Sequence, residues 1–194
     1  EVERYALEKS KLLKTLANSI EFSLENNFKI LEELSNDKDI IEINIPSLQS
    51  KYARAFQRFP SYIGNVSRVD EKGILRYTFP PDPKAIGRDI SYQAHIKKFL
   101  IEKKPFVSEV FRSVQGYDAV TLGQPVFDIR GNFKGNVSCL IDVKKMLEHF
   151  SKLAGEGLDQ FYVFNLNNQK ILYSNDLSSI GQNFFEVANK FVRA

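Results

Sequence analysis

This chain of 194 residues has one cysteine, no tryptophan and no long apolar run. A single cysteine, Cys139, excludes an internal disulfide, although it leaves the cellular compartment open. No stretch of about 20 apolar residues is present, so no segment of the sequence is expected to cross a membrane. The chain also begins without methionine, at Glu1, and we expect it to be part of a longer protein.

An excess of charge of one sign is also lacking. The sequence holds 27 Lys and Arg against 24 Asp and Glu, a net charge of +3, and the two signs are interleaved. Such a balance does not favour nucleic acid as a partner. The 43% share of hydrophobic residues is ordinary for a globular protein, and the length suits one domain or slightly more.

Catalytic and metal-binding constellations are missing as well. Cys139 lies in an apolar stretch without a base beside it, and we interpret it as a small buried hydrophobic residue. His95 and His149 pair with no cysteine or carboxylate at metal-ligand spacing, so neither a metal nor a cofactor is predicted. The segment "GNFKG" (131–135) lacks the Lys-Ser/Thr ending of a phosphate-binding loop. No enzymatic activity is therefore expected for this chain.

The pattern of apolar residues predicts an α+β fold. Residues 1–36 contain neither Gly nor Pro and repeat apolar residues at steps of three and four, which predicts one long helix. Its narrow leucine stripe suits packing against another helix, in the same chain or in a partner copy. A short helix that Pro60 stops follows, and then an antiparallel sheet of about five strands with helical cover on one side.

Two stretches of the chain are nearly the same. "KGILRYTFPPDPKAIGRD" (72–89) and "QKILYSNDLSSIGQN" (169–183) share Ile-Leu, a Tyr, a polar loop, Ile-Gly and then an Asp or Asn. Each is typical of a hairpin, a loop and the start of a helix, so the repeat predicts two sheet modules of one kind. We expect a helix at 1–38, a first module at 39–156, and a second module at 157–194 that is either cut short or small.

Several motifs of the first module together resemble a known family. They are the turn "DEKG" (70–73), "IGRDIS" (86–91), "KPFVSEVF" (104–111) and "QPVFDIRGNFKGNVSCLIDV" (124–143). With the long first helix, they resemble the membrane-distal module of a double Cache domain, an extracytoplasmic sensor of histidine kinases, chemoreceptors and cyclases. The resemblance implies a PAS-like antiparallel sheet in each module and a small ligand between the sheet and its covering helix.

The resemblance also implies a place in the cell membrane. The long helix would lead in from one transmembrane segment, and a second segment would follow, both outside this sequence. Among the output types, a two-component sensor histidine kinase is favoured, with chemoreceptor and cyclase open. The rival hypothesis is a constitutive dimerisation or interaction module that uses the N-terminal helix and takes no small-molecule ligand.

The covering helix supplies the first candidate binding residues. A loop with Pro80 and Pro81 leads to this helix, which we expect to begin near Asp89, with Asp89 or Ser91 as its cap. Its free backbone N–H groups could then take an anionic group of the ligand. Tyr92 and His95 lie three residues apart and share a helix face.

The last strand of the first module supplies a candidate acid. Asp142 shares a strand face with Ser138 and Leu140, and it either binds the ligand or caps the next helix. In amino-acid-sensing relatives an acid near this place takes the ligand ammonium, and an arginine with paired aromatics at the start of the covering helix holds the carboxylate.

The arginine clamp of those relatives is absent here. Gln93, His95 and Ile96 stand at the matching places. Arg76 or Arg88 would have to substitute, so a neutral, smaller or differently charged ligand is expected as readily as an α-amino acid. The remaining candidates for the site are Tyr77, Ser108 and Tyr117.

Overall fold

The computed structural model describes residues 2–113, 116–154, 162–164, 166, 169–174, 177–179 and 182–192. They belong to two compact units. The larger unit contains residues 21–142, and the smaller contains the first 20 residues together with 143–194. Helix α1 (Val2–Ser35) contributes to both units and confirms the predicted long N-terminal helix.

The larger unit is built on an antiparallel sheet of six strands. Their order in space is β2–β1–β6–β5–β3, and β4 also pairs with β5. The strands are β1 (Ile63–Val69), β2 (Leu75–Phe79), β3 (Phe106–Val107), β4 (Phe111–Arg112), β5 (Asp118–Phe127) and β6 (Phe133–Asp142). The hairpin of β1 with β2 agrees with the prediction for residues 72–89, and the pairing of β5 with β6 agrees with the predicted antiparallel sheet. The segment 105–113 contains two short strands, β3 and β4.

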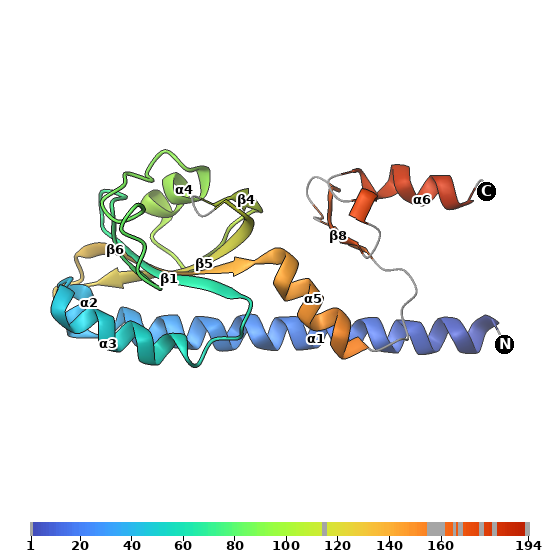
Figure 1. The fold of residues 1–194 in the computed structure, drawn as a ribbon, viewed down its shortest axis with the longest axis horizontal. Helices are drawn as coiled ribbons and strands as arrows, with labels where there is room; N and C mark the ends of the chain where they lie inside the picture. The colour runs from blue at the N-terminus through green and yellow to red at the C-terminus, as the bar shows by residue number, and fades with distance from the viewer. Residues whose placement is uncertain are drawn as a thin grey trace. The chain divides into compact units, whose positions relative to one another are not determined.

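Helices cover both faces of this sheet (Figure 1), so the prediction of cover on one side only is wrong. On one face lie the C-terminal part of α1, the short α2 (Lys38–Ile41) and α3 (Ile45–Phe56). Helix α4 (Ala94–Glu102) lies on the other face.

The face toward α1 and α3 is the apolar core. Leu31 of α1 and Leu48 and Tyr52 of α3 are fully buried, and Leu48 and Tyr52 are four residues apart on one helix face. The Tyr52 ring meets the Tyr77 ring of β2 edge to face, with centroids 5.2 Å apart. Each fully buried side chain of this size contributes about 1.5–3 kcal/mol to folding.

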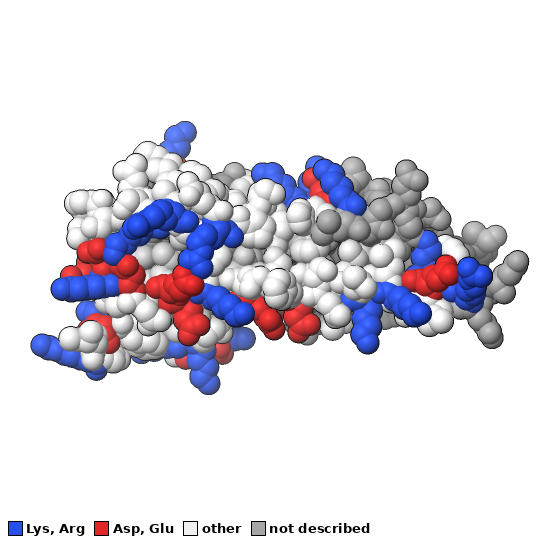
Figure 2. Space-filling model, turned by 90° about the horizontal axis from the view of Figure 1, so that it is seen from below, with Lys and Arg blue, Asp and Glu red and all other residues white. Residues whose placement is uncertain are grey.

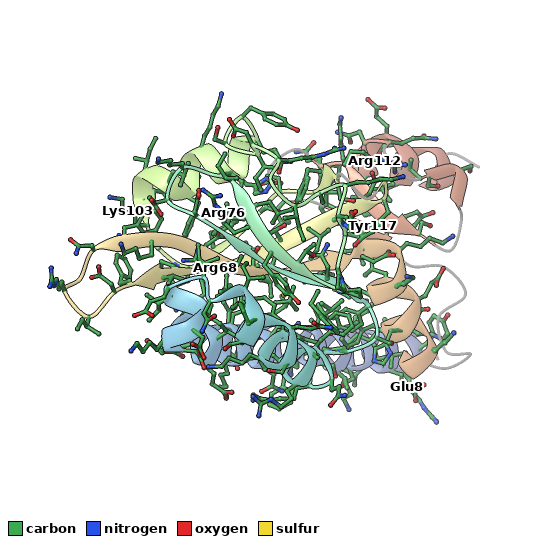
Figure 3. The ribbon with its side chains drawn as sticks, turned by 60° about the vertical axis from the view of Figure 1, so that its left-hand side comes forward. Glu8, Arg68, Arg76, Lys103, Arg112 and Tyr117 are labelled. Carbon is green, nitrogen blue, oxygen red and sulfur yellow. The ribbon has the colours of Figure 1, made fainter. Side chains whose placement is uncertain are left out.

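A buried arginine joins the sheet to the corner after α1. Arg68 of β1 is fully buried, and burial lowers the pKa of its guanidinium. Figure 3 labels it beside α2. Its three nitrogens donate hydrogen bonds to the backbone carbonyls of Ile40, Ile41, Val69, Lys134 and Asn136. One side chain therefore ties α2, β1 and β6 together.

The first of the two similar stretches closes its hairpin with a backbone latch. Ile74 pairs with Asp89, and the Leu75 amide donates to the Arg88 carbonyl at 3.0 Å. Gly87 donates its amide to the Leu75 carbonyl at 2.7 Å and has φ +86°. A positive φ is costly for residues with a Cβ, which explains the glycine of the Ile-Gly motif.

The smaller unit repeats this latch. It contains α5 (Val143–Ala154), the hairpin of β7 (Tyr162–Phe164) with β8 (Ile171–Ser174), the 3-10 helix η2 (Leu177–Ser179) and α6 (Phe184–Val192). Lys170 pairs with Asn183, and the Ile171 amide donates to the Gln182 carbonyl at 2.9 Å. Ile171 thus takes the place of Leu75, one residue away from the match that the shared Ile-Leu suggests. The second Ile-Gly (180–181) lies outside the described residues.

Charges of both signs intermingle on the surface. The face shown in Figure 2 carries blue and red side chains side by side over the larger unit. An example is Arg58 of the segment after α3, which pairs with Glu33 of α1 and holds the pKa of that carboxyl below its usual value.

Candidate functional site

Two cavities adjoin between α4 and the sheet. The inner cavity, about 50 Å³, is lined by β1, β2, β5 and β6, and the outer one, about 800 Å³, by α4 and the segment of β3 and β4. Gln93, His95, Phe111 and Ser113 line both and form the boundary between them. Small-molecule sites usually measure about 300–1,000 Å³, so the outer cavity has room for a ligand body and the inner one for a single group.

Neutral polar side chains line the inner cavity. The hydroxyls of Ser67 and Ser138, which face each other across β1 and β6, are 2.8 Å apart. Among the described residues that line this cavity there is no Asp, Glu, Lys or Arg. Its small polar residues are Asn65, Ser67, Thr78, Ser113, Thr121 and Ser138.

Sequence reasoning missed most of these residues. Of these residues, the sequence pattern indicated only Ser138, as a neighbour of Asp142 on its strand face. A signal was present, because Ser67 and Ser138 are small polar residues within strands whose other residues are mostly buried. In such a strand a small polar residue on a covered face of the sheet marks a polar cavity or a cross-strand hydrogen bond.

His95 forms part of the wall between the two cavities. It lies in the first turn of α4, with its ring centroid 4.3 Å from that of Phe111 and 6.2 Å from that of Phe106. Burial lowers the pKa of His95 to about 4, so the ring is neutral at pH 7. A neutral imidazole offers one hydrogen-bond donor and one acceptor to the cavities.

The outer cavity contains two further predicted residues. Tyr92, just before α4, lines it and is 65% exposed. Ser108 also lines it, but its hydroxyl already accepts from the Thr121 amide at 2.9 Å and donates to the Glu109 carbonyl at 2.7 Å. The charged residues of this cavity carry both signs: Lys98, Glu102, Lys104, Glu109 and Arg112.

Asp142 and Tyr117 line neither cavity. Asp142 is 8% exposed, and its amide donates to the Tyr62 carbonyl at 2.9 Å. Tyr117 lies against Gly64 of β1, and burial together with the Asp142 charge raises the pKa of its phenol. Leu140, two residues before Asp142, does line the inner cavity, so the predicted strand face enters it but ends before the acid.

The structure brings Arg76, Tyr77 and Arg88 to neither cavity. Arg76, labelled in Figure 3, donates to Asp70 at 2.6 Å and lines a separate cavity at the start of β2. Tyr77 is directed to the opposite face, against Tyr52. Arg88 is exposed in the loop before α4. Arg76 and Tyr77 are neighbours in one strand, so alternation sends them to opposite sides.

Helix α4 begins later than the sequence predicted. Its first residue is Ala94, and its cap, Gln93, makes no side-chain capping bond. Asp89 instead accepts a hydrogen bond from the Ser91 amide at 2.8 Å, within a turn that precedes the helix. The predicted cap at Asp89 or Ser91 is therefore wrong, and so is the anion site that depended on it, because the same Asp-x-Ser pattern also makes such turns.

No group of three or more His, Cys, Asp and Glu among the described residues could hold a metal ion. Cys139 is 1% exposed, and burial raises the pKa of its thiol, which leaves little of the reactive thiolate. A helix long and apolar enough to cross a membrane is not found among these residues.

The sequence matches one family of sensor domains. A model of the family described as "HK/GC/Chemotaxis protein-like, sensor domain" matches residues 29–143, which is more than half of the chain. Among curated proteins, none matches.

Solved structures share the fold at low sequence identity. An extracellular ligand binding receptor from Desulfohalobium retbaense has a TM-score of 0.77 and 22% identity, over 94% of this chain and 34% of its own. The ligand binding domain of the Pseudomonas aeruginosa amino acid chemoreceptor PctC, in complex with GABA, has a TM-score of 0.65 and 19% identity, over 91% and 79%. The sensor domain of the V. cholerae histidine kinase DctB has a TM-score of 0.64 and 14% identity, over 89% and 67%.

These likenesses confirm the predicted α+β fold with its long first helix. The chain spans about a third of the length of the Desulfohalobium receptor. At identities below 25% the likeness concerns the fold, so any ligand must be argued from the residues of this chain.

Proposed function

The chain belongs to the HK/GC/chemotaxis protein-like sensor-domain family, and we propose that it senses a small molecule held between α4 and the sheet. The observation that carries this proposal is the pair of adjoining cavities there, the inner one lined by polar side chains and the outer one large enough for a ligand. Concave sites with a few convergent polar groups are typical of small-molecule binding. The PctC domain in complex with GABA supports a ligand of this size class.

We place the domain in the extracytoplasmic part of a membrane receptor. A two-component sensor histidine kinase is favoured, and chemoreceptor and cyclase are the other outputs; the family description and the DctB and PctC domains support this range. The kinase or other output would lie outside the 194 residues. The division into a helix (1–38), a distal module (39–156) and a second module (157–194) is supported by the repeated hairpin latch.

A ligand in these cavities would act by stabilising one of two arrangements of α4 against the sheet. It shifts their equilibrium only by its difference in affinity for the two. The start of β1 offers a connection to the long helix, because the Tyr62 hydroxyl hydrogen-bonds the Ser23 hydroxyl of α1. The backbone carbonyl of Tyr62 also accepts a hydrogen bond from the Asp142 amide at the end of β6.

A thermal-shift screen tests the proposal. The purified chain is screened against amino acids, small carboxylates, amines, purines and sugars. A ligand at about 100 times its Kd adds roughly 2.7 kcal/mol, a shift of a few degrees in Tm. Ser138→Val, which fills the inner cavity, should reduce the shift, and Thr15→Val, on the exposed surface of α1, should not. A shift that is the same in both variants contradicts the proposed site.

A constitutive interaction module is the second candidate. Four large apolar side chains of α1 are exposed: Tyr5 (56%), Leu7 (56%), Leu13 (48%) and Phe22 (63%). Sedimentation velocity over a range of concentrations separates the candidates. A stable dimer that Phe22→Ser and Leu13→Ser dissociate, with no hit in the screen, favours the interaction module through the N-terminal helix.

A further inference from the structure

The lining of the inner cavity limits the chemistry of the ligand. Resting on the function proposed above, we infer that the ligand presents an uncharged hydrogen-bonding group, such as an amide, to the inner cavity and keeps any charged group in the outer one. The group is small, since the inner cavity measures about 50 Å³. The body of the ligand then passes the boundary of His95 and Phe111.

A charged group in the inner cavity would have no counter-ion. The described lining residues include no acid and no base, and His95 is neutral at pH 7. Asp142 ends the strand beyond the cavity, and Arg76 is held by Asp70 outside it. A charge that leaves water without a partner loses far more hydration energy than hydrogen bonds from neutral groups return. A carboxylate or an ammonium is therefore rejected there.

The inner cavity also offers donors and acceptors together. In the described structure, the side chains of Asn65, Gln93, His95 and Thr121 form no hydrogen bond with another residue, and all four line the cavity. Each of these side chains can donate and accept. An amide, which also does both, satisfies them better than a carboxylate, which only accepts, or an ammonium, which only donates.

The outer cavity imposes no such limit. Its rim carries Lys98, Lys104 and Arg112 together with Glu102 and Glu109, and several of these are paired at the surface, as Arg112 is with Asp118 at 3.1 Å. Solvent reaches these groups, so a charged end of a ligand remains hydrated there. An amino acid would fit this division only if its zwitterionic end stayed outside and a neutral side-chain group entered.

Three small probes of different charge test the inference: acetamide, acetate and methylammonium. Saturation-transfer NMR measures their binding to the whole chain at about 50 mM, because a ligand of two to four heavy atoms binds weakly. The variants are Ser138→Val, which fills the cavity, and Thr121→Val, which removes a hydroxyl and keeps the shape. Thr15→Val makes the same chemical change on the exposed surface of α1 and is the control.

We expect acetamide to bind the original chain and the Thr15→Val control alike. Thr121→Val should weaken it about two- to tenfold, the effect of one hydrogen bond, and Ser138→Val should abolish it. Acetate and methylammonium should show the same weak signal in all four proteins. If a charged probe instead loses binding in the cavity variants, the inferred chemical class is wrong while the site stands. If no probe responds to either variant, the inference and the proposed site both fail.

Discussion

Phe106 of β3 lies directly opposite Gly123 of β5, and its ring occupies the space that a side chain on Gly123 would need. Phe106 also lines the outer cavity and is in ring contact with Phe99 of α4, with centroids 4.9 Å apart. The absence of a Cβ at Gly123 thus decides how close the cavity wall lies to the sheet.

Gly123→Ala should therefore destabilise the chain and disturb the outer cavity. The added Cβ would overlap the Phe106 ring, and overpacking of this kind costs about 1–3 kcal/mol. Urea unfolding measures the loss. In a Phe106→Ala background the same change should cost much less, because the overlap is gone. An equal cost in both backgrounds would show that the ring is not the obstacle.

Arg68→Met should be among the most destabilising substitutions in the larger unit. Methionine keeps much of the apolar stem but removes every donor to the carbonyls of α2, β1 and β6. Leaving several buried carbonyls without donors should cost roughly 2–4 kcal/mol. Arg130→Met, at an exposed residue, is the matched control and should change the unfolding free energy by about 0.5 kcal/mol or less.

His95 should make stability depend on pH below neutrality. Its pKa is about 4 in the folded chain, below the ordinary value of 6.5, so the unfolded chain binds its proton first. The neutral His95 ring contributes its full share of the folding stability above pH 6.5, and this contribution is lost as the pH falls from 6.5 toward 4. The loss should be roughly 1–2 kcal/mol after allowance for solvent around the ring.

The variant His95→Phe keeps a ring against Phe111 and removes the titration. Unfolding free energies of both proteins at pH 7 and pH 5 isolate the histidine, because the other titrating groups are common to both. The prediction fails if the variant loses as much stability between these pH values as the original chain.

The bond between Tyr62 and Ser23 should couple β1 to α1. Tyr62→Phe and Ser23→Ala each remove one hydroxyl of the pair. A double-mutant cycle in urea should give a coupling energy of about 0.5–1.5 kcal/mol, the net value of one hydrogen bond. Additive effects would mean that the two hydroxyls stabilise the fold independently.

Much of the fold could be predicted from the sequence because strand alternation and turn residues are local signals. The hairpin after Asp70 and the strands β5 and β6 follow from them. The start of α4 could not be predicted, because Asp89 and Ser91 satisfy the rules for a turn and for a helix cap equally. Nor could the face of Tyr77, since alternation fixes which residues share a side but not which side meets which helix.

The candidate site could be predicted only in part. His95 of α4 lines both cavities and Tyr92, just before α4, lines the outer one, because this helix covers the sheet as expected. Asp142 does not, because the length of β6 places it beyond the end of the inner cavity. The burial of Arg68 could not be predicted, since a single arginine in a strand gives no sign that it will be buried with carbonyls as partners.

The guanidinium of Arg68 has a mechanical consequence. Because it donates hydrogen bonds to five backbone carbonyls of α2, β1 and β6, it holds the corner after α1 and the centre of the sheet together as one rigid unit. On the opposite face α4 starts without a side-chain cap and is followed by strands of only two residues. Hinge motion is absorbed where few bonds resist it. We therefore expect that, in the proposed sensor, ligand binding displaces α4 and the two short strands after it and leaves the opposite face of the sheet in place.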